Sequence, residues 1–136
     1  MDILEVAYQR FSANPIIKNY CEDRIKYYVG PETMDSSKPF MIIEPVDVDV
    51  PAMFSSDEII ADEFFIQVSV EAPQRKVPKE IQAEVRKELR EIGMAQLANG
   101  LDEYFKDTKR YVDARRYRGV PVRLFLLEEE VKWEQQ

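Results

Sequence analysis

The sequence predicts a single α+β domain in which a mainly antiparallel β-sheet packs against two helices. Residues 2–13 and 78–97 carry apolar side chains at helical spacing, whereas several other segments alternate apolar and polar residues as strands do. The chain has 136 residues, of which 45% are hydrophobic, enough for one real core but not for two. No repeat or linker divides it, so we expect one domain over residues 1–136.

The first helix is predicted over residues 2–13. In "DILEVAYQRFSAN" the apolar side chains recur every three or four residues, Asp2 can cap the start, and the pair Asn14-Pro15 can end the helix. The segment "DRIKYYV" then alternates apolar and polar residues and predicts a strand over 23–29. Residues 30–38, "GPETMDSSK", have the composition of a loop.

A short buried strand is predicted over Pro39–Pro45, where four consecutive apolar residues lie between prolines. The alternation in "VDVDVP" allows that strand to continue to Val50 with an acidic outer face. Residues 52–61, "AMFSSDEIIA", follow neither period, so we expect a loop. Because this loop carries apolar residues, among them Met53 and Phe54, those side chains need a partner inside or outside the subunit.

The clearest strand is predicted over Asp62–Ala72, where "DEFFIQVSVEA" alternates strictly. The second helix is predicted over 78–97, because Pro78 suits a first helical position and an apolar stripe follows at helical spacing. The other face of this helix carries mixed charges that suit solvent.

Two periods compete over residues 101–119. The apolar residues fit a helix, and the same residues also fit a hairpin with a turn at 106–108. Periodicity alone narrowly favours the helix. After this segment, "PVRLFLL" predicts a final strand over 121–127, and residues 128–136 are expected to form a polar, flexible tail.

Missing residue types exclude several catalytic designs. The chain has no histidine, which removes Ser-His-Asp and Cys-His machinery and HExxH zinc sites. Its four glycines lie too far apart for a Walker loop or a dinucleotide-binding GxGxxG. We therefore expect that the protein is not an enzyme and binds no cofactor. The single cysteine, Cys21, cannot form an internal disulfide and is expected to be buried or idle, which agrees with a reducing compartment.

Carboxylates are the remaining candidates for chemistry. Asp47 and Asp49 would lie on one strand face and could hold a divalent cation. They lack the glycine and the distal glutamate of a calcium loop, so a solvated acidic face is favoured and no metal site is predicted. No apolar run reaches the length of a membrane span, and the first residues do not resemble a signal peptide. We expect a soluble protein made in a cytoplasm.

The segment "KRYVDARRYRG" concentrates positive charge in a chain whose net charge is -7. We call its five cations the basic strip: Lys109, Arg110, Arg115, Arg116 and Arg118. Such a composition fits a subunit contact, a solvated surface or a nucleic-acid-binding surface. An acidic chain with one basic segment is complementary to its own copies, which favours the subunit contact. The basic strip, Met53 and Phe54 are therefore the candidate subunit-interface residues.

The element order, with "PFMIIEP", "FFIQVSV", "LREIGM" and "DEYFKDTKRYVDARRYRG", resembles a known family. The resemblance is to the tail-terminator or tail-completion (head-tail joining) proteins of long-tailed bacteriophages and prophages. In that family an Asp-Thr-type turn precedes a strand ending in "RYR", and Asp107-Thr108 and Arg116-Tyr117-Arg118 match this pattern. The resemblance therefore predicts a hairpin over 103–118, where periodicity alone favours a helix.

The resemblance implies a structural role in virion assembly. Family members form a homo-oligomeric ring, commonly a hexamer, that caps the completed tail tube and offers a docking surface to the head. The implied partners are copies of the chain itself, the major tail tube protein and a head-completion or connector protein, with genomic DNA passing through the lumen without sequence readout. The implied location is the top of the virion tail, reached from the host cytoplasm, with no membrane. Alternatives are a head-tail connector or minor tail protein, or a small nucleic-acid-binding module using Lys109–Arg118.

Overall fold

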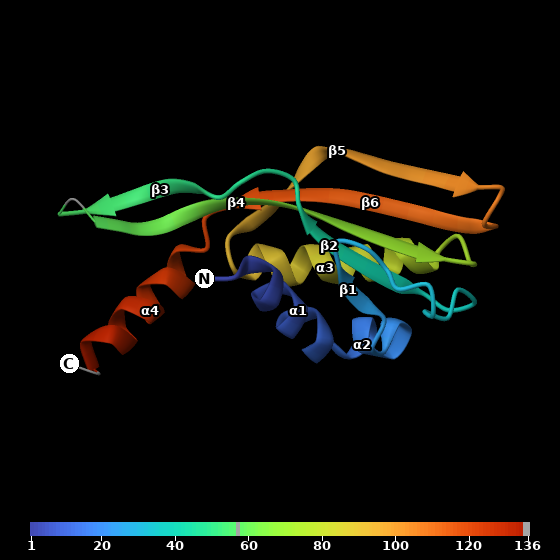
Figure 1. The fold of residues 1–136 in the computed structure, drawn as a ribbon, viewed down its shortest axis with the longest axis horizontal. Helices are drawn as coiled ribbons and strands as arrows, with labels where there is room; N and C mark the ends of the chain where they lie inside the picture. Colours follow the sequence, from blue (N-terminus) through green and yellow to red (C-terminus); the bar gives the residue numbers. More distant parts are fainter. Residues whose placement is uncertain (57, 135–136) are drawn as a thin grey trace.

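The computed structural model describes residues 1–56 and 58–134 and shows one α+β domain built on an open, mixed sheet (Figure 1). The helices are α1 (Ile3–Ala13), α2 (Pro15–Cys21), α3 (Val77–Glu91) and α4 (Val122–Glu134). The strands are β1 (Ile25–Tyr27), β2 (Phe40–Pro45), β3 (Val50–Ser55), β4 (Glu58–Ala72), β5 (Met94–Phe105) and β6 (Arg110–Gly119). The predicted fold class is confirmed.

The strands lie in the order β1-β2-β4-β6-β5, and β3 pairs with β4 off this path. Of the described strand pairs, only β1 and β2 run parallel, so the sheet is mainly antiparallel, as predicted. Helices α1, α2 and α3 lie along one face of the sheet, and none of the described helices covers the opposite face (Figure 1). No helix in the part of the chain that the structure describes is long and apolar enough to cross a membrane.

The N-terminal helix forms where it was predicted. The Oδ1 atom of Asp2 accepts a hydrogen bond from the backbone N–H of Leu4 at 3.0 Å and caps α1. Asn14 ends α1 and caps α2, because its Oδ1 accepts the N–H groups of Ile16 and Ile17. Helix α2 was not predicted, since its seven residues are too few to establish a period.

The arrangement of residues 46–61 corrects two predictions. Residues 46–49 are not in a strand. Of residues 52–61, predicted as a loop, residues 52–55 form most of β3 and residues 58–61 form the start of β4. The register between these strands shifts between Pro51 and Met53 and again between Met53 and Phe54. Such bulges break the period-two pattern on which a strand prediction depends, and Ser56 takes a positive φ of 50° at the turn.

The second predicted helix begins near its expected residue but ends earlier. Helix α3 stops at Glu91, and residues 94–97, predicted as helical, open β5. Gly93 has φ +90°, a left-handed conformation that reverses the chain. Gly119 lies opposite Met94, and a Cβ atom at Gly119 would overlap the carbonyl oxygen of Gly93. The two glycines therefore permit the close return from helix to strand.

The hairpin predicted over 103–118 is confirmed, and the helical interpretation of residues 101–119 is wrong. The hairpin is longer than expected because β5 extends back to Met94, and Lys109 closes the turn with φ +57°.

The C-terminal segment corrects another prediction. The strand predicted over 121–127 is wrong, since Val122–Glu134 form α4, which also takes in residues 128–134 of the expected tail. Phe125 of α4 stacks on Phe64 of β4 with ring centroids 6.0 Å apart. A short apolar run fits either element, and this packing selects the helix. Residues 135 and 136 lie outside the described residues.

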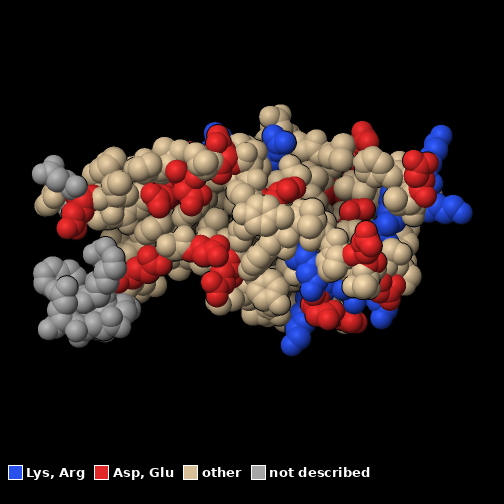
Figure 2. Space-filling view, in the orientation of Figure 1, with Lys and Arg blue, Asp and Glu red and all other residues tan. Residues whose placement is uncertain are grey.

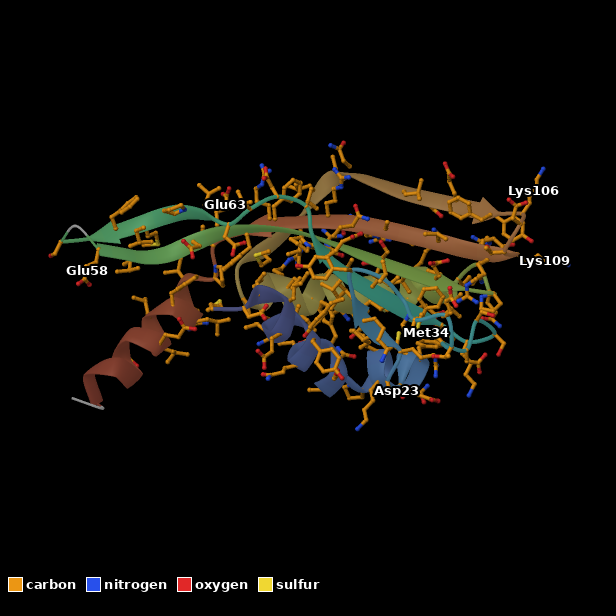
Figure 3. The ribbon with its side chains drawn as sticks, in the orientation of Figure 1. Asp23, Met34, Glu58, Glu63, Lys106 and Lys109 are labelled. Atoms are coloured by element: carbon orange, nitrogen blue, oxygen red, sulfur yellow. The ribbon has the colours of Figure 1, made fainter. Side chains whose placement is uncertain are left out.

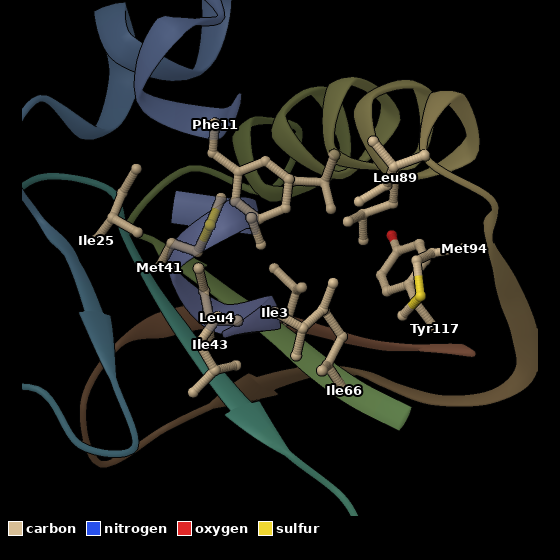
Figure 4. Close-up of a cluster of buried hydrophobic side chains, with 14 of the residues drawn as sticks. Ile3, Leu4, Phe11, Ile25, Met41, Ile43, Ile66, Leu89, Met94 and Tyr117 are labelled. Atoms are coloured by element: carbon tan, nitrogen blue, oxygen red, sulfur yellow. The ribbon is translucent and has the colours of Figure 1, made fainter. Parts of the chain in front are cut away.

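The core lies between the helices and the sheet, where Phe11, Met41, Ile66 and Leu89 are fully or almost fully buried (Figure 4). These side chains come from α1, β2, β4 and α3, so the core joins both layers of the domain.

A polar network lies within this apolar layer, centred on the fully buried Gln82 of α3. Its Nε2 donates to the backbone oxygens of Val68 at 2.8 Å and Asp113 at 3.0 Å, on two neighbouring strands. The hydroxyl of Tyr117 donates to Gln82 Oε1 at 3.0 Å, and burial raises the pKa of this phenol, which stays a neutral donor. The network fixes α3 over β4 and β6.

We expect Gln82→Leu to destabilise the fold by about 1–3 kcal/mol, because it leaves the buried Tyr117 hydroxyl without its acceptor. Tyr117→Phe should cost about 1 kcal/mol, and the double variant should cost less than the two single changes combined, since it removes both partners. Urea unfolding curves measure these differences. Gln74→Leu, in an exposed loop, is the control and should change stability by less than about 0.5 kcal/mol. Additive losses would contradict the coupling.

Candidate assembly surfaces

A two-stranded arm extends from one end of the molecule. We define the arm as β3 together with residues 58–63 of β4. Strand β6 pairs with β4 only from Phe64 onward, and β2 only from Ile66 onward, so residues 58–63 pair with β3 alone. Figure 1 shows the arm projecting past the helical layer that α1, α2 and α3 form. The sheet's core therefore supports the base of the arm but not its tip.

The arm presents large apolar side chains to solvent. Phe54 is 65% exposed and Ile59 is 56% exposed, and the two residues face each other across the strands. Val50 and Met53 are exposed as well. A two-stranded hairpin is marginally stable alone in water, and a contiguous apolar patch on a protein surface often marks an interaction site. The sequence indicates that Met53 and Phe54 need a partner inside or outside the subunit. Within the described part of the chain, no residue buries these two side chains.

The arm and its surroundings are strongly acidic. Residues 39–74 contain eight carboxylates and no Lys or Arg. Figure 2 shows Asp and Glu side chains along the half of the molecule that bears the arm. At the base of the arm, burial raises the pKa of Asp49, and the nearby charge of Asp62 raises it further.

The face of the sheet that the helices leave uncovered, which we call the open face, contains a shallow groove of about 410 Å³. Residues opposite each other in the register share a face, so Ile42, Ser69 and Ala114 lie together. Leu101 and Phe105, at the edge of the groove, are 38% and 40% exposed. The groove is lined by side chains of β2, β4, β5, β6 and the β5–β6 turn, together with Tyr28. The uncharged residues of this lining are Tyr28, Ile42, Gln67, Ser69, Leu101, Phe105, Thr108, Val112 and Ala114, and the carboxylates are Glu44, Glu71 and Asp107. The groove is therefore a mixed surface in which apolar side chains lie among polar and acidic ones.

Strand alternation divides the basic strip between two faces of the sheet. Arg115 faces the helices, where its Nε donates to Asp113 Oδ1 at 2.9 Å and its Nη1 donates to Gln96 Oε1 at 3.3 Å. Arg116 lies on the open face and donates from Nε to Gln67 Oε1 at 3.1 Å. These two adjacent arginines thus have separate partners within their own chain.

The other members of the basic strip also differ in exposure. Arg110 is buried, with its guanidinium 4.7 Å from the ring centre of Phe40 and its Nη2 donating to the backbone oxygen of Lys38 at 3.0 Å. Arg118 covers the ring of Phe65, with its side chain about half exposed. Lys109 is exposed in the turn. Among the candidate interface residues, the most accessible ones are Lys109, Arg118, Met53 and Phe54.

Exposed cations gather at the end of the molecule opposite the arm, which we call the basic end. Figure 3 shows Lys106 and Lys109 at this end and Glu58 at the other. The Arg110 bond to Lys38 and the pairing of β4 with β6 at Ala72 bring the loops 30–38 and 73–76 to the same end. The exposed cations of the basic end are Lys38, Arg75, Lys76, Lys106 and Lys109. None of them forms an ion pair with a residue that the structure describes.

Of these cations, only Lys109 was predicted from the sequence. Lys38, Arg75 and Lys76 lie in two loops far apart in the chain, and no local pattern shows that the loops meet. The acidity of the arm could be predicted from the sequence, because residues 39–74 contain no Lys or Arg.

The remaining candidates for chemistry are the carboxylates and the single cysteine. Within the described residues, no group of three or more His, Cys, Asp or Glu side chains is placed to hold a metal ion. Asp47 accepts the backbone N–H of Val48 at 2.8 Å, in a segment that is not a strand. Cys21 is fully buried, and burial raises the pKa of its thiol to about 12.

Comparison with solved structures shows a likeness in fold, whereas comparison of the sequence does not identify a family. No protein-family model matches the sequence, and no curated protein matches it. The fold is similar to that of a chain in a solved structure described as "Virion of native gene transfer agent (GTA) particle", with a TM-score of 0.64 and 13% sequence identity. The likeness covers 87% of this chain and 92% of that chain. At this identity it shows a shared fold, over nearly the whole of both chains.

We expect Cys21 to resist thiol reagents in the native protein. With a pKa of about 12, roughly one thiol in ten thousand is ionised at pH 8, and the side chain has no access to solvent. Labelling with a chromogenic disulfide should therefore become fast only after unfolding in denaturant. Ser36→Cys, in an exposed loop, provides the matched control and should react at once in the native state. Equal rates at the two positions would contradict the assigned burial.

Proposed function

We propose that the chain is a structural subunit of a phage-like virion, and that within the virion it belongs to the ring that completes the tail tube and receives the head. The observation that carries this proposal is the shared fold with a virion chain of a gene transfer agent particle, which extends over 87% of this chain. The resemblance of its segments to tail-terminator proteins points to the same class of particle. Neither likeness involves a catalytic residue, and we propose a non-enzymatic role.

The surfaces of the molecule support an assembly role. An arm with exposed apolar side chains and a groove of mixed character suit contacts with other proteins, and both are built on the sheet. In the proposed ring, the partners are further copies of the chain, tail-tube subunits below and a head-completion protein above. DNA would pass the ring without sequence readout, and a net charge of -7 gives its phosphates little to bind.

A role as a nucleic-acid-binding module is less well supported. Such a module needs its cations on one accessible surface. Arg110 is buried, and Arg115 and Arg116 lie on opposite faces of the sheet with partners in their own chain. A head-tail connector or minor tail protein is the alternative within the same particle, and the phenotype of a gene inactivation separates it from the terminator.

We expect inactivation of the gene to give overlong tails that carry no heads. The reason is that an uncapped tube end continues to accept tube subunits and offers no surface to the connector. Electron microscopy of lysates measures tail length and head attachment, and expression of the wild-type chain from a second copy is the control. Tails of normal length without heads would instead indicate a connector. Complete, normal particles would contradict a role in tail completion.

A further inference from the structure

We propose that the arm docks onto a different protein of the particle, one that presents lysine or arginine side chains around an apolar hollow. Phe54 and Ile59 enter that hollow, and the carboxylates of the arm face the cations at its rim. This inference rests on the proposed function, because it names the kind of partner that an assembly subunit would bind through this surface.

The apolar part of the contact is the pair of Phe54 and Ile59. The two residues lie opposite each other near the end of the arm, where β3 and β4 pair with none of the other described strands. Each of them is more than half exposed. Burying the pair in a partner would remove large apolar side chains from water, and it would support a hairpin that is marginally stable alone.

The charges beside this pair are negative. Glu58 adjoins Ile59 near the tip, and Asp62 lies nearer the base. Neither carboxylate forms an ion pair with a residue that the structure describes, whereas Glu63 has Arg118 at 4.0 Å. The arm itself contains no Lys or Arg. Such a surface attracts lysine and arginine on another protein, and it repels the phosphates of nucleic acids and of anionic lipids.

Helix α4 lies at the same end of the molecule as the arm (Figure 1) and has a similar character. Its Leu126 and Leu127 are exposed. Its sequence contains four Glu against one Arg and one Lys. The acidic and apolar surface available to a partner is therefore larger than the arm alone.

The surface chemistry of the chain indicates that this partner is not a second copy. One acidic arm repels another. In five hollows on the described surface, the carboxylates are at least as numerous as the Lys and Arg side chains. The crevice beside α1 and α4, for example, sets Glu88 and Glu128 against Arg10, and the groove of the open face has carboxylates but no cation. Asp35 and Asp107 also lie among the lysines of the basic end. A cationic hollow is therefore expected on another chain.

The test changes the arm in three ways. The reversed variant is Glu58→Lys with Asp62→Lys, the neutral variant is Glu58→Gln with Asp62→Asn, and the apolar variant is Phe54→Ser with Ile59→Ser. The probes are tails and heads, purified separately from lysates in which the gene has been inactivated. Co-sedimentation of the purified chain with each probe measures binding. The wild type should bind at least one of the two probes, and more weakly as the NaCl concentration is raised.

The three variants should differ in a defined order. The reversed variant should bind roughly tenfold or more weakly than the wild type, and the neutral variant should lie between the two. This order follows the charge of the arm, whereas a general disturbance of the fold would not follow it. The apolar variant should also bind roughly tenfold more weakly, and it should keep the salt dependence of the wild type.

Two further variants serve as controls. Asp23→Lys with Glu32→Lys changes the net charge as much as the reversed variant does, at exposed positions, and Figure 3 shows Asp23 far from the arm. Ile16→Ser removes an exposed apolar side chain of α2. Both controls should bind as the wild type does. Circular dichroism of each purified variant checks that it is folded.

The outcomes separate this inference from the proposed function. Weaker binding of all three arm variants, with unchanged controls, would support arm docking. Binding that neither salt nor neutralisation weakens would mean a partner without the proposed cations, and the inference would be wrong. If all arm variants bind like the wild type, arm docking is also wrong, while tail completion still stands on the phenotype of gene inactivation.

Sedimentation velocity of the chain alone shows whether the arm instead contacts a second copy. If the arm variants self-associate more weakly than the wild type but bind tails and heads normally, the occupant is another copy and the inference is overturned. If the wild type binds neither tails nor heads, both the inference and the proposed function fail.

Discussion

The arrangement of the whole molecule depends on strand β4, which is longer than any strand that pairs with it. Its fifteen residues span about 50 Å at the usual rise of a β-strand. Residues 64–72 pair with β6, residues 66–71 also pair with β2, and alternate apolar side chains of this part are buried under the helices. Among the described strands, residues 58–63 pair only with β3. Strand β4 therefore belongs to the core along most of its length and to the arm along the rest. Because a shift of the buried part would expose Phe64, Ile66 and Val68, the base of the arm is held in one register with the sheet.

The register between β4 and β6 determines which side chains lie on the open face and which lie under the helices. It places Arg115 opposite Val68 on the helical side and Arg116 opposite Gln67 on the open face. A slip of one residue would exchange these faces, bury one guanidinium among apolar side chains and expose the other. The network of Gln82 and Tyr117 opposes such a slip, since Gln82 bonds to backbone oxygens of both strands at once. A buried polar group of this kind specifies one arrangement of the sheet, and the open face inherits its pattern of side chains from it.

Local patterns predicted the elements whose signals are local. Asp2 as a cap, the alternation of residues 62–72 and the start of α3 near Pro78 could all be recognised in the sequence. The failures occurred where a tertiary feature decides the outcome. Gly93 ends α3 by its close approach to Gly119, and bulges in β3 hide the arm from a period-two search. The apolar residues of the arm could be recognised in the sequence, and their place in an interface stays a prediction. The groove joins four strands and could not be predicted without the sheet order.

The distribution of charge bears on how copies of the chain can meet. All nineteen Lys and Arg residues lie outside residues 39–74, together with the remaining eighteen of the twenty-six acids, so that segment accounts for the acidity of the chain. Charges on exposed surfaces are screened over about 8 Å at physiological salt and contribute little binding energy by themselves. In an assembly of such chains, surface charges would mainly penalise wrong orientations, such as one acidic arm against another. In the proposed ring, every subunit contact has one polarity, and contacts of a single polarity are what a closed ring requires.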